Sequence, residues 1–221
     1  AIQPDYEKVW SVRGYSLGAL KRYSEALSSY EQAIRLEPHD AVVWNLRGLA
    51  LYYLQRDDEA IKSYDHAIEL CKDYGDAWKN RAFSLYYLQK YEDAVLNTDR
   101  AIELGQGNNY LLWFYRGVAL MELDRNEEAL VSLNRSIQLK GDYPNAFYYR
   151  GRVLHSMKQY TEAISSFDQA LRLDSVFVMA WLWCGHSLNE LGRREDAIYA
   201  YDRAIKLDPN CSAAWLARDT A

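Results

Sequence analysis

The chain has 221 residues, and 49% of them are hydrophobic, which is enough for a substantial buried core. Its formal net charge of −5 and the lack of a basic cluster disfavour nucleic acid as a partner, because nucleic-acid binding needs a positive surface. No apolar run approaches the roughly 20 residues of a membrane span, so membrane insertion is not expected. Three cysteines without a CxxC pair, and no signal-peptide pattern, favour a cytoplasmic protein.

One aromatic residue recurs along the chain at a nearly constant interval. The steps are 34, 34, 35, 34, 34 and 34 residues, and the members are Trp10, Trp44, Trp78, Trp113, Phe147, Trp181 and Trp215. A fixed period of this length indicates one supersecondary unit stacked repeatedly. Positions in each repeat are counted from this residue, so that +3 lies three residues after it.

Each repeat is predicted to form two helices. Gly or Ala stands at +4 and Leu at +7, while Ala at +16 is followed by a mostly aromatic +20 and a small +23. Each of these sets lies on one helical face, which places helices at about residues 41–54 and 57–70 in the second repeat. The small residues let the two helices approach closely. The predicted repeats are 7–40, 41–74, 75–109, 110–143, 144–177 and 178–211, with a partial seventh at 212–221, all in one array over 1–221.

This pattern resembles the tetratricopeptide repeat (TPR) family, whose signature is W…LG…Y…A…F…P. The resemblance implies an all-α fold, a right-handed solenoid of stacked antiparallel helix pairs. It also implies a non-enzymatic protein that binds partners on a concave surface lined by the first helix of each pair. The closing proline of the family is present as Pro38 and Pro209, and other residues replace it elsewhere.

Charged residues form a second periodic pattern. Arginine recurs at +3, and an acid recurs at +21 in most repeats, so we expect bidentate pairs between the two helices. A structural ladder that fixes helix register is favoured over an anion-binding row. Cys184 takes the arginine position in the sixth repeat and is predicted to be a buried, structural thiol.

The positions that the resemblance places on the concave surface are rich in aromatic residues, which commonly anchor interfaces. We therefore expect a peptide or partner-protein segment to bind there, with amide and charged groups holding its polar atoms. The predicted binding residues are Asn45, Leu49, Tyr52, Lys79, Asn80, Phe83, Tyr86, Phe114, Tyr115, Tyr148, Arg152, His155, Trp183, His186 and Asn189. The alternative for individual rings, such as Tyr53, Tyr87 and Tyr149, is packing against neighbouring helices.

The two-carboxylate clamp of this family, which binds extreme C-terminal peptides, is absent. Asn80 occupies one of its positions, but Leu49, Leu111 and Tyr115 stand at others, so a chaperone tail is not the expected ligand.

The sequence contains no catalytic or paired-cysteine metal motif, so no catalytic residue, cofactor or metal is expected. A two-histidine site formed by His155 and His186 with Glu190 is a minor alternative. Two other functions remain open. The module could self-associate into a homo-oligomer, or it could be the regulatory region of a larger enzyme. The chain ends inside a predicted helix, which favours a fragment of a longer protein.

Overall fold

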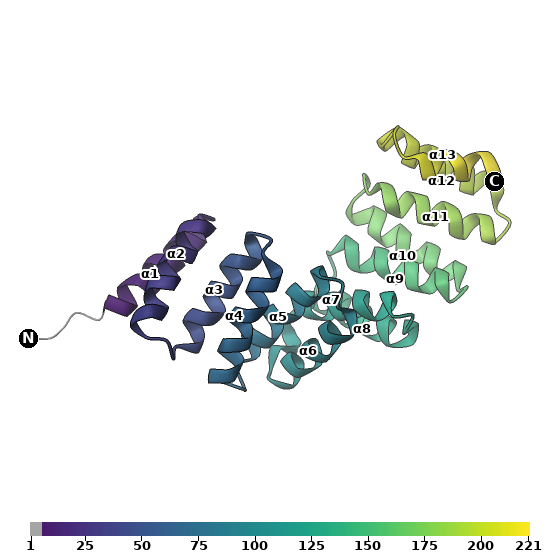
Figure 1. The fold of residues 1–221 in the computed structure, drawn as a ribbon. Helices are drawn as coiled ribbons and strands as arrows, with labels where there is room; N and C mark the ends of the chain where they lie inside the picture. The colour runs from purple at the N-terminus through teal and green to yellow at the C-terminus, as the bar shows by residue number, and fades with distance from the viewer. Residues whose placement is uncertain (1–5) are drawn as a thin grey trace, which may run out of the picture. The chain divides into compact units, whose positions relative to one another are not determined.

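The computed structural model describes residues 6–221, and these form only helices and their connections (Figure 1). No helix in this part of the chain has both the length and the hydropathy to cross a membrane. The helices are α1 (Tyr6–Ala19), α2 (Tyr23–Leu36), α3 (Ala41–Tyr53), α4 (Asp57–Leu70), α5 (Gly75–Tyr87), α6 (Tyr91–Glu103), the 3-10 helix η1 (Gln106–Asn108), α7 (Tyr110–Glu122), α8 (Asn126–Leu139), α9 (Pro144–Ser156), α10 (Tyr160–Leu173), α11 (Val178–Glu190), α12 (Arg194–Leu207) and α13 (Ser212–Thr220).

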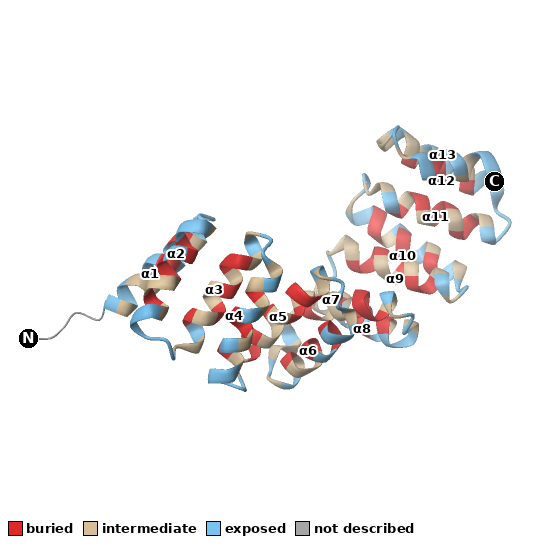
Figure 2. Ribbon diagram, in the orientation of Figure 1, coloured by how far each residue is buried: buried red, intermediate tan, exposed pale blue. Residues whose placement is uncertain are grey.

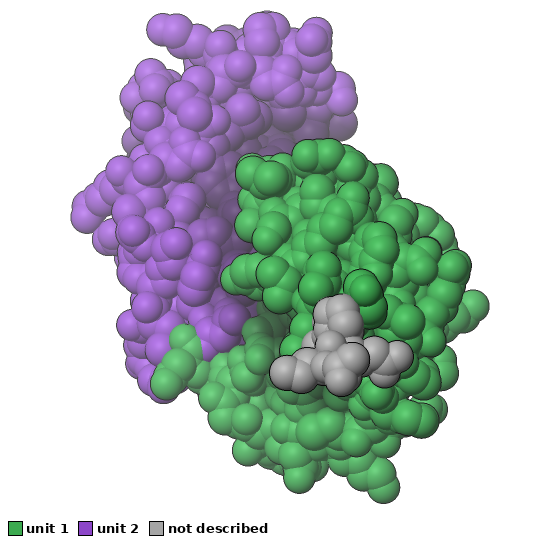
Figure 3. All heavy atoms as spheres, turned by 90° about the vertical axis from the view of Figure 1, so that its left-hand side faces the viewer, with its two compact units in different colours: residues 1–108 green, residues 109–221 purple. Residues whose placement is uncertain are grey.

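Consecutive helices pack as pairs, α1 with α2 through α11 with α12, and each pair occupies one predicted repeat. The predicted all-α solenoid class is confirmed, and α3 and α4 match the expected helices of the second repeat to within one residue. The pairs fall into two compact units, residues 1–108 and residues 109–221 (Figure 3). A single array over 1–221 stays a prediction, and its first five residues lie outside the described part.

The turn between the helices of each pair has the same backbone geometry in every repeat. In the second repeat, Gln55 adopts a φ of 59° and the Arg56 amide donates to the Leu51 carbonyl at 2.9 Å. This is the left-handed helix ending that glycine usually supplies. Only the sixth repeat has glycine at this turn position. In chain order, the residues with positive φ in these turns are Lys21, Gln55, Gln89, Asp124, Lys158 and Gly192.

Figure 2 shows buried residues along the helices of the pairs, and in most pairs a small residue of the first helix faces a ring of the second. A Cβ added at Gly48 would lie 2.5 Å from Cε1 of Tyr64, whose side chain is fully buried. In the third repeat, Ala82 replaces the glycine and the smaller Thr98 replaces the ring. The predicted steric role of the small residues is therefore confirmed.

The recurring tryptophan links its repeat to the preceding one, as Trp44, Trp78, Trp181 and Trp215 show. The indole Nε1 of Trp44 donates to the carbonyl of Pro38 at 2.9 Å, and Trp78 donates in the same way to Lys72 at 2.9 Å. In the second unit, Trp181 donates to Ser175 at 3.1 Å. The residue thus has a directional function in addition to packing, because its hydrogen bond fixes where the next pair begins.

The arginines at +3 form a ladder with a different geometry from the predicted one. Arg81 donates from Nε to Asp65 at 2.7 Å and from Nη1 to Asn97 at 2.9 Å. Arg47 makes the same two contacts, to Glu31 of the preceding repeat and to Ser63 of its own. The prediction of bidentate acid pairs is wrong for these two arginines, because each one divides its donors between two repeats.

The sixth repeat lacks both members of this arrangement. Cys184 stands in place of the arginine and Ala200 in place of its serine or asparagine partner. The guanidinium of Arg203, from α12, instead lies 5.3 Å from the ring centre of Trp181. Cys184 is 4% exposed, and burial raises the pKa of its thiol to about 12, which confirms the predicted buried cysteine.

Candidate functional site

The predicted binding residues lie on the first helices of the pairs, in both units. In the first unit, α3 and α5 carry Asn45, Leu49, Tyr52, Lys79, Asn80, Phe83 and Tyr86. In the second unit, α7, α9 and α11 carry Phe114, Tyr115, Tyr148, Arg152, His155, Trp183, His186 and Asn189.

The two asparagines of the first unit differ from expectation. Asn45 and Asn80 are 5% and 8% exposed. Nδ2 of Asn80 donates to Oδ1 of Asn45 at 2.9 Å, and Nδ2 of Asn45 donates to the Tyr74 hydroxyl at 3.3 Å. These positions face the neighbouring first helix, so the amides join α3 to α5. The expectation that both amides bind a ligand is corrected on this point, because both side chains are almost fully buried and each amide already hydrogen-bonds within the protein.

Lys79 is also engaged within the protein. Its ammonium group pairs with Asp76, one turn earlier on α5, and lies 3.4 Å from Oε1 of Gln106. Leu49 and Phe83, on the same pair of helices, are partly exposed.

Six tyrosines of the first unit form a continuous series of ring contacts, here named the tyrosine row. Neighbouring centroids lie 4.6 to 5.9 Å apart, and the first two rings are stacked with an interplanar angle of 13°. In order, the members are Tyr23, Tyr53, Tyr52, Tyr87, Tyr86 and Tyr91. Tyr53 and Tyr87 are 52% and 50% exposed, so they pack against neighbours and also present ring surface to solvent.

A cavity of about 420 Å³ lies beside Tyr52, Tyr53 and Tyr87, with Asp57 and Gln55 on its wall. Burial raises the pKa of Tyr52, and hydrogen bonding with Tyr87 raises it further. The Tyr52 hydroxyl is therefore neutral at physiological pH and can donate or accept a hydrogen bond.

Two predicted aromatic residues of the second unit are core residues. Phe114 and Tyr148 are 5% and 6% exposed. Phe114 packs against Tyr115, Tyr143 and Tyr149 with ring centroids 5.1 to 5.4 Å apart. The expectation that these two rings present surface to a ligand is therefore corrected, because neighbouring aromatic side chains already enclose them.

Arg152 is the central charged group of the second unit. Its guanidinium carbon lies 5.1 Å from the ring centre of Trp183, 5.7 Å from that of Tyr149 and 6.0 Å from that of Tyr148. Its buried Nε has no hydrogen-bond partner among the residues described. Contacts with ring faces favour a cation and hold its orientation, while leaving donors for a further acceptor.

A cavity of about 320 Å³ adjoins this arginine. Trp183 and His155 line it with Arg152, and Glu122 and Asp124 contribute negative charge. The cavity therefore combines an aromatic surface, a cation and carboxylates, which suits a mixed polar and apolar ligand more than a strongly charged one.

The two histidines have protein partners. Nδ1 of His155 lies 2.9 Å from the Ser187 hydroxyl, and Nδ1 of His186 lies 3.2 Å from the Tyr201 hydroxyl. Burial lowers the pKa of both imidazoles, so they are neutral at pH 7. Over residues 6–221, no three His, Cys, Asp or Glu side chains come together as metal ligands, so nothing supports the minor metal alternative.

Some members of the tyrosine row lie outside the predicted set. Tyr23 and Tyr91 occupy +13, at the start of the second helix of a pair, whereas the predicted binding residues all lie on first helices. The visible signal is the repetition of a tyrosine doublet, Tyr52-Tyr53 and Tyr86-Tyr87, followed by a tyrosine at +13 in the third repeat.

Comparisons with solved structures establish the fold. The chain is similar to YrrB, described as a TPR protein with an unusual peptide-binding site, at 24% identity and a TM-score of 0.77 over 86% of this chain and 97% of that one. It is similar to PilW, described as a widely conserved type IV pilus biogenesis factor, at 18% identity and a TM-score of 0.81 over 97% and 99% of the two chains. It is also similar to pilF of Pseudomonas aeruginosa, at 14% identity and a TM-score of 0.81 over 97% of each.

No curated protein sequence matches the chain significantly. A family model, described as tetratricopeptide repeat, matches residues 12–74, 80–146 and 148–212. These spans cover most of the chain and agree with the helix pairs, the glycine–ring packing and the tryptophan register. The protein therefore belongs to the tetratricopeptide repeat family.

Proposed function

We propose that the protein is a non-enzymatic interaction module that binds a peptide or a partner-protein segment on the first-helix surfaces of its repeats. The family generally acts in protein–protein interaction. The observation that carries the proposal is the tyrosine row of the first unit, in which Tyr53 and Tyr87 remain half exposed.

The tyrosine row is suited to binding because its rings already pack against one another in the free protein. Each edge-to-face or stacked pair contributes about 0.5–1.5 kcal/mol beyond its buried area, so the rings are ordered before any ligand arrives. Binding then immobilises few additional side chains, which reduces the entropy lost on association. Tyrosine also combines a large apolar surface with a hydroxyl, as residues that dominate interfaces commonly do.

The Arg152 cavity offers a second, polar contact within the other unit. Arg152 forms no ion pair with any described residue, and its guanidinium has more N–H donors than its hydrogen bond with Tyr148 uses. A backbone carbonyl or a single carboxylate of a ligand would satisfy these donors, whereas the nearby Glu122 and Asp124 disfavour a strongly acidic ligand. The printed description of YrrB as peptide-binding supports the same class of function.

The experiment is a selection of displayed random peptides on the folded chain, followed by affinity measurement of the enriched sequences. Replacing Tyr53 and Tyr87 together with alanine should weaken binding by about tenfold or more, since each exposed anchor ring contributes on the order of 1 kcal/mol or more. Tyr199→Ala is the matched control, because Tyr199 is 60% exposed but lies on α12, a second helix. The proposal fails if no peptide is enriched, or if the double variant binds as tightly as the unmodified chain.

A further inference from the structure

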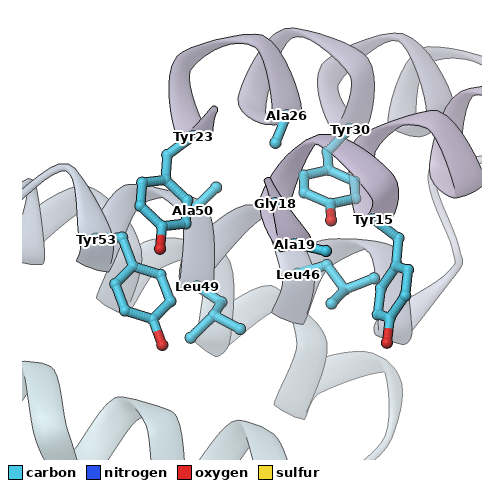
Figure 4. Close-up of a pocket in the computed structure, with 10 residues that line it drawn as sticks. All are labelled: Tyr15, Gly18, Ala19, Tyr23, Ala26, Tyr30, Leu46, Leu49, Ala50 and Tyr53. Carbon is cyan, nitrogen blue, oxygen red and sulfur yellow. The ribbon is translucent and has the colours of Figure 1, made fainter. Parts of the chain in front are cut away.

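A small cavity lies between α1, α2 and α3 of the first unit (Figure 4). Its volume is about 170 Å³, and most of its lining is apolar. Figure 4 shows the rings of Tyr23 and Tyr53 on one side and those of Tyr15 and Tyr30 on the other. Leu46 and Leu49 of α3 also line it.

The cavity exists because the first repeat lacks a side chain at +8. That position is Gly18 here, whereas the later repeats have Tyr52, Tyr86, Met121, His155 and Asn189. A Cβ added at Gly18 would meet only the Tyr30 hydroxyl, at 3.8 Å. The space that a larger residue fills in the other repeats is therefore open in this one.

The second repeat shows which group fits such a space. Tyr52 at +8 contacts Tyr87, the +9 residue of the following repeat, with ring centroids 5.7 Å apart. The residue equivalent to Tyr87 beside the cavity is Tyr53, which is half exposed. A cavity of about 150 Å³ holds one benzene molecule, so the volume also matches a single ring.

A polar group is directed into the cavity. The Tyr30 side chain is 3% exposed and lines the cavity, and its hydroxyl oxygen is not among the buried, unpaired polar atoms of residues 6–221, so the cavity keeps it accessible. The equivalent tyrosine of the sixth repeat, Tyr201, bonds His186 through its hydroxyl. A ligand with a polar group can therefore pair with this hydroxyl from inside the cavity, and it gains a hydrogen bond as well as apolar contact.

We propose that this cavity binds the side chain of a tyrosine from a partner protein. The ring packs against Tyr53 as Tyr52 packs against Tyr87, and the phenol hydroxyl pairs with Tyr30. The inference rests on the proposed function for the source of the ring, but the cavity belongs to the first unit alone.

The test uses p-cresol, the side chain of tyrosine, and toluene, the side chain of phenylalanine, as probes titrated into the full chain and followed by NMR of the Leu46 and Leu49 methyl groups. We expect saturable shifts with a p-cresol dissociation constant on the order of 1 mM, as suits so small a ligand. Toluene should bind about fivefold more weakly, the equivalent of one hydrogen bond. Tyr30→Phe should weaken p-cresol binding to the level of toluene and leave toluene unchanged.

Gly18→Tyr should abolish binding of both probes by filling the cavity with the residue that the second repeat has there. Gly18→Leu serves as a second filling variant, and circular dichroism checks that both variants fold. Ser16→Tyr is the matched control, because Ser16 is exposed on the same helix and does not line the cavity.

Absence of saturable shifts, or binding that survives in a folded Gly18 variant, overturns the proposal. Equal affinity for both probes overturns the choice of tyrosine. Failure of the proposed function is a different result: p-cresol binds but the peptide selection enriches nothing. The reverse, enriched peptides without p-cresol binding, removes only this inference.

Discussion

Two glycine-to-alanine substitutions on first helices should have opposite effects on stability. Gly48 of α3 and Gly18 of α1 are both helical, so alanine gains about 1 kcal/mol of helix propensity at either site. The sites differ in what the new methyl group meets, and this difference determines the sign.

At Gly48 the methyl carbon would lie 2.5, 2.7 and 2.9 Å from three ring atoms of Tyr64. Ordinary contacts are about 3.5–4.0 Å, so the fully buried ring would have to move by about 1 Å. Such overpacking costs about 1–3 kcal/mol, and a close contact with three ring atoms belongs in the upper half of that range. We therefore expect a net loss of about 1–2 kcal/mol for Gly48→Ala, against a gain of about 0.5–1 kcal/mol for Gly18→Ala.

The assay is urea unfolding followed by far-UV circular dichroism. Hydrogen exchange of the α3 and α4 amides is measured alongside, because repeat arrays sum local and nearest-neighbour energies. Adding Tyr64→Thr to Gly48→Ala recreates the Ala82–Thr98 combination of the third repeat. In that background, alanine should become stabilising at residue 48. The reasoning is refuted if Gly48→Ala is as stable as Gly18→Ala, or if alanine stays destabilising beside threonine.

Three further predictions concern charges and ionisation. Arg81→Ala should lower the free energy of unfolding by about 1 kcal/mol, since Asp65 and Asn97 lose their donor. Arg81→Lys should recover less than half of this loss, because one ammonium group cannot reach both partners. Full recovery by lysine would contradict this explanation. Cys184 should resist a thiol reagent at pH 8 while the exposed Cys71 reacts, since burial raises the pKa of Cys184 to about 12; equal reaction rates in the folded chain would contradict the burial. Burial lowers the folded-state pKa of His155 and His186 below the ordinary 6.5, so as the pH falls the unfolded chain binds protons before the folded chain does. The free energy of unfolding should therefore fall as the pH drops below about 6.5. Replacing both histidines with glutamine should flatten this fall, and an unchanged slope would count against the reasoning.

The sequence was sufficient to predict the helix pairs because one physical requirement repeats in every unit. A small residue faces a larger side chain, a ring in most repeats, where the two helices approach closely, and this requirement appears as a fixed spacing along the chain. The same spacing could not show that arginine divides its donors between two repeats. Its partners lie 16 residues away in each direction, and the choice between a bidentate and a divided contact depends on helix rotation.

The candidate site was less predictable because the exposure of a side chain depends on the residues that pack around it in the folded chain. Asn45 and Asn80 stand at positions that commonly face a ligand in this family, yet they bond each other across the junction between repeats. The cavity beside Gly18 arises because glycine has no side chain at +8. It can be recognised only by comparison with the larger residues at +8 in the later repeats. Sequence spacing identifies such positions but cannot report which side chains enclose them.

The links between repeats also constrain how such a chain can change in length during evolution. Within the units, arginine contacts the +21 residue 16 positions earlier, as in Arg47 with Glu31, and tryptophan contacts the carbonyl six positions earlier, as in Trp44 with Pro38. A tandem duplication of one whole repeat preserves both contacts at the new junction, since each partner recurs at the same separation. A deletion that removes part of a repeat separates at least one pair. Homologous chains that differ in length should therefore differ by whole repeats of about 34 residues.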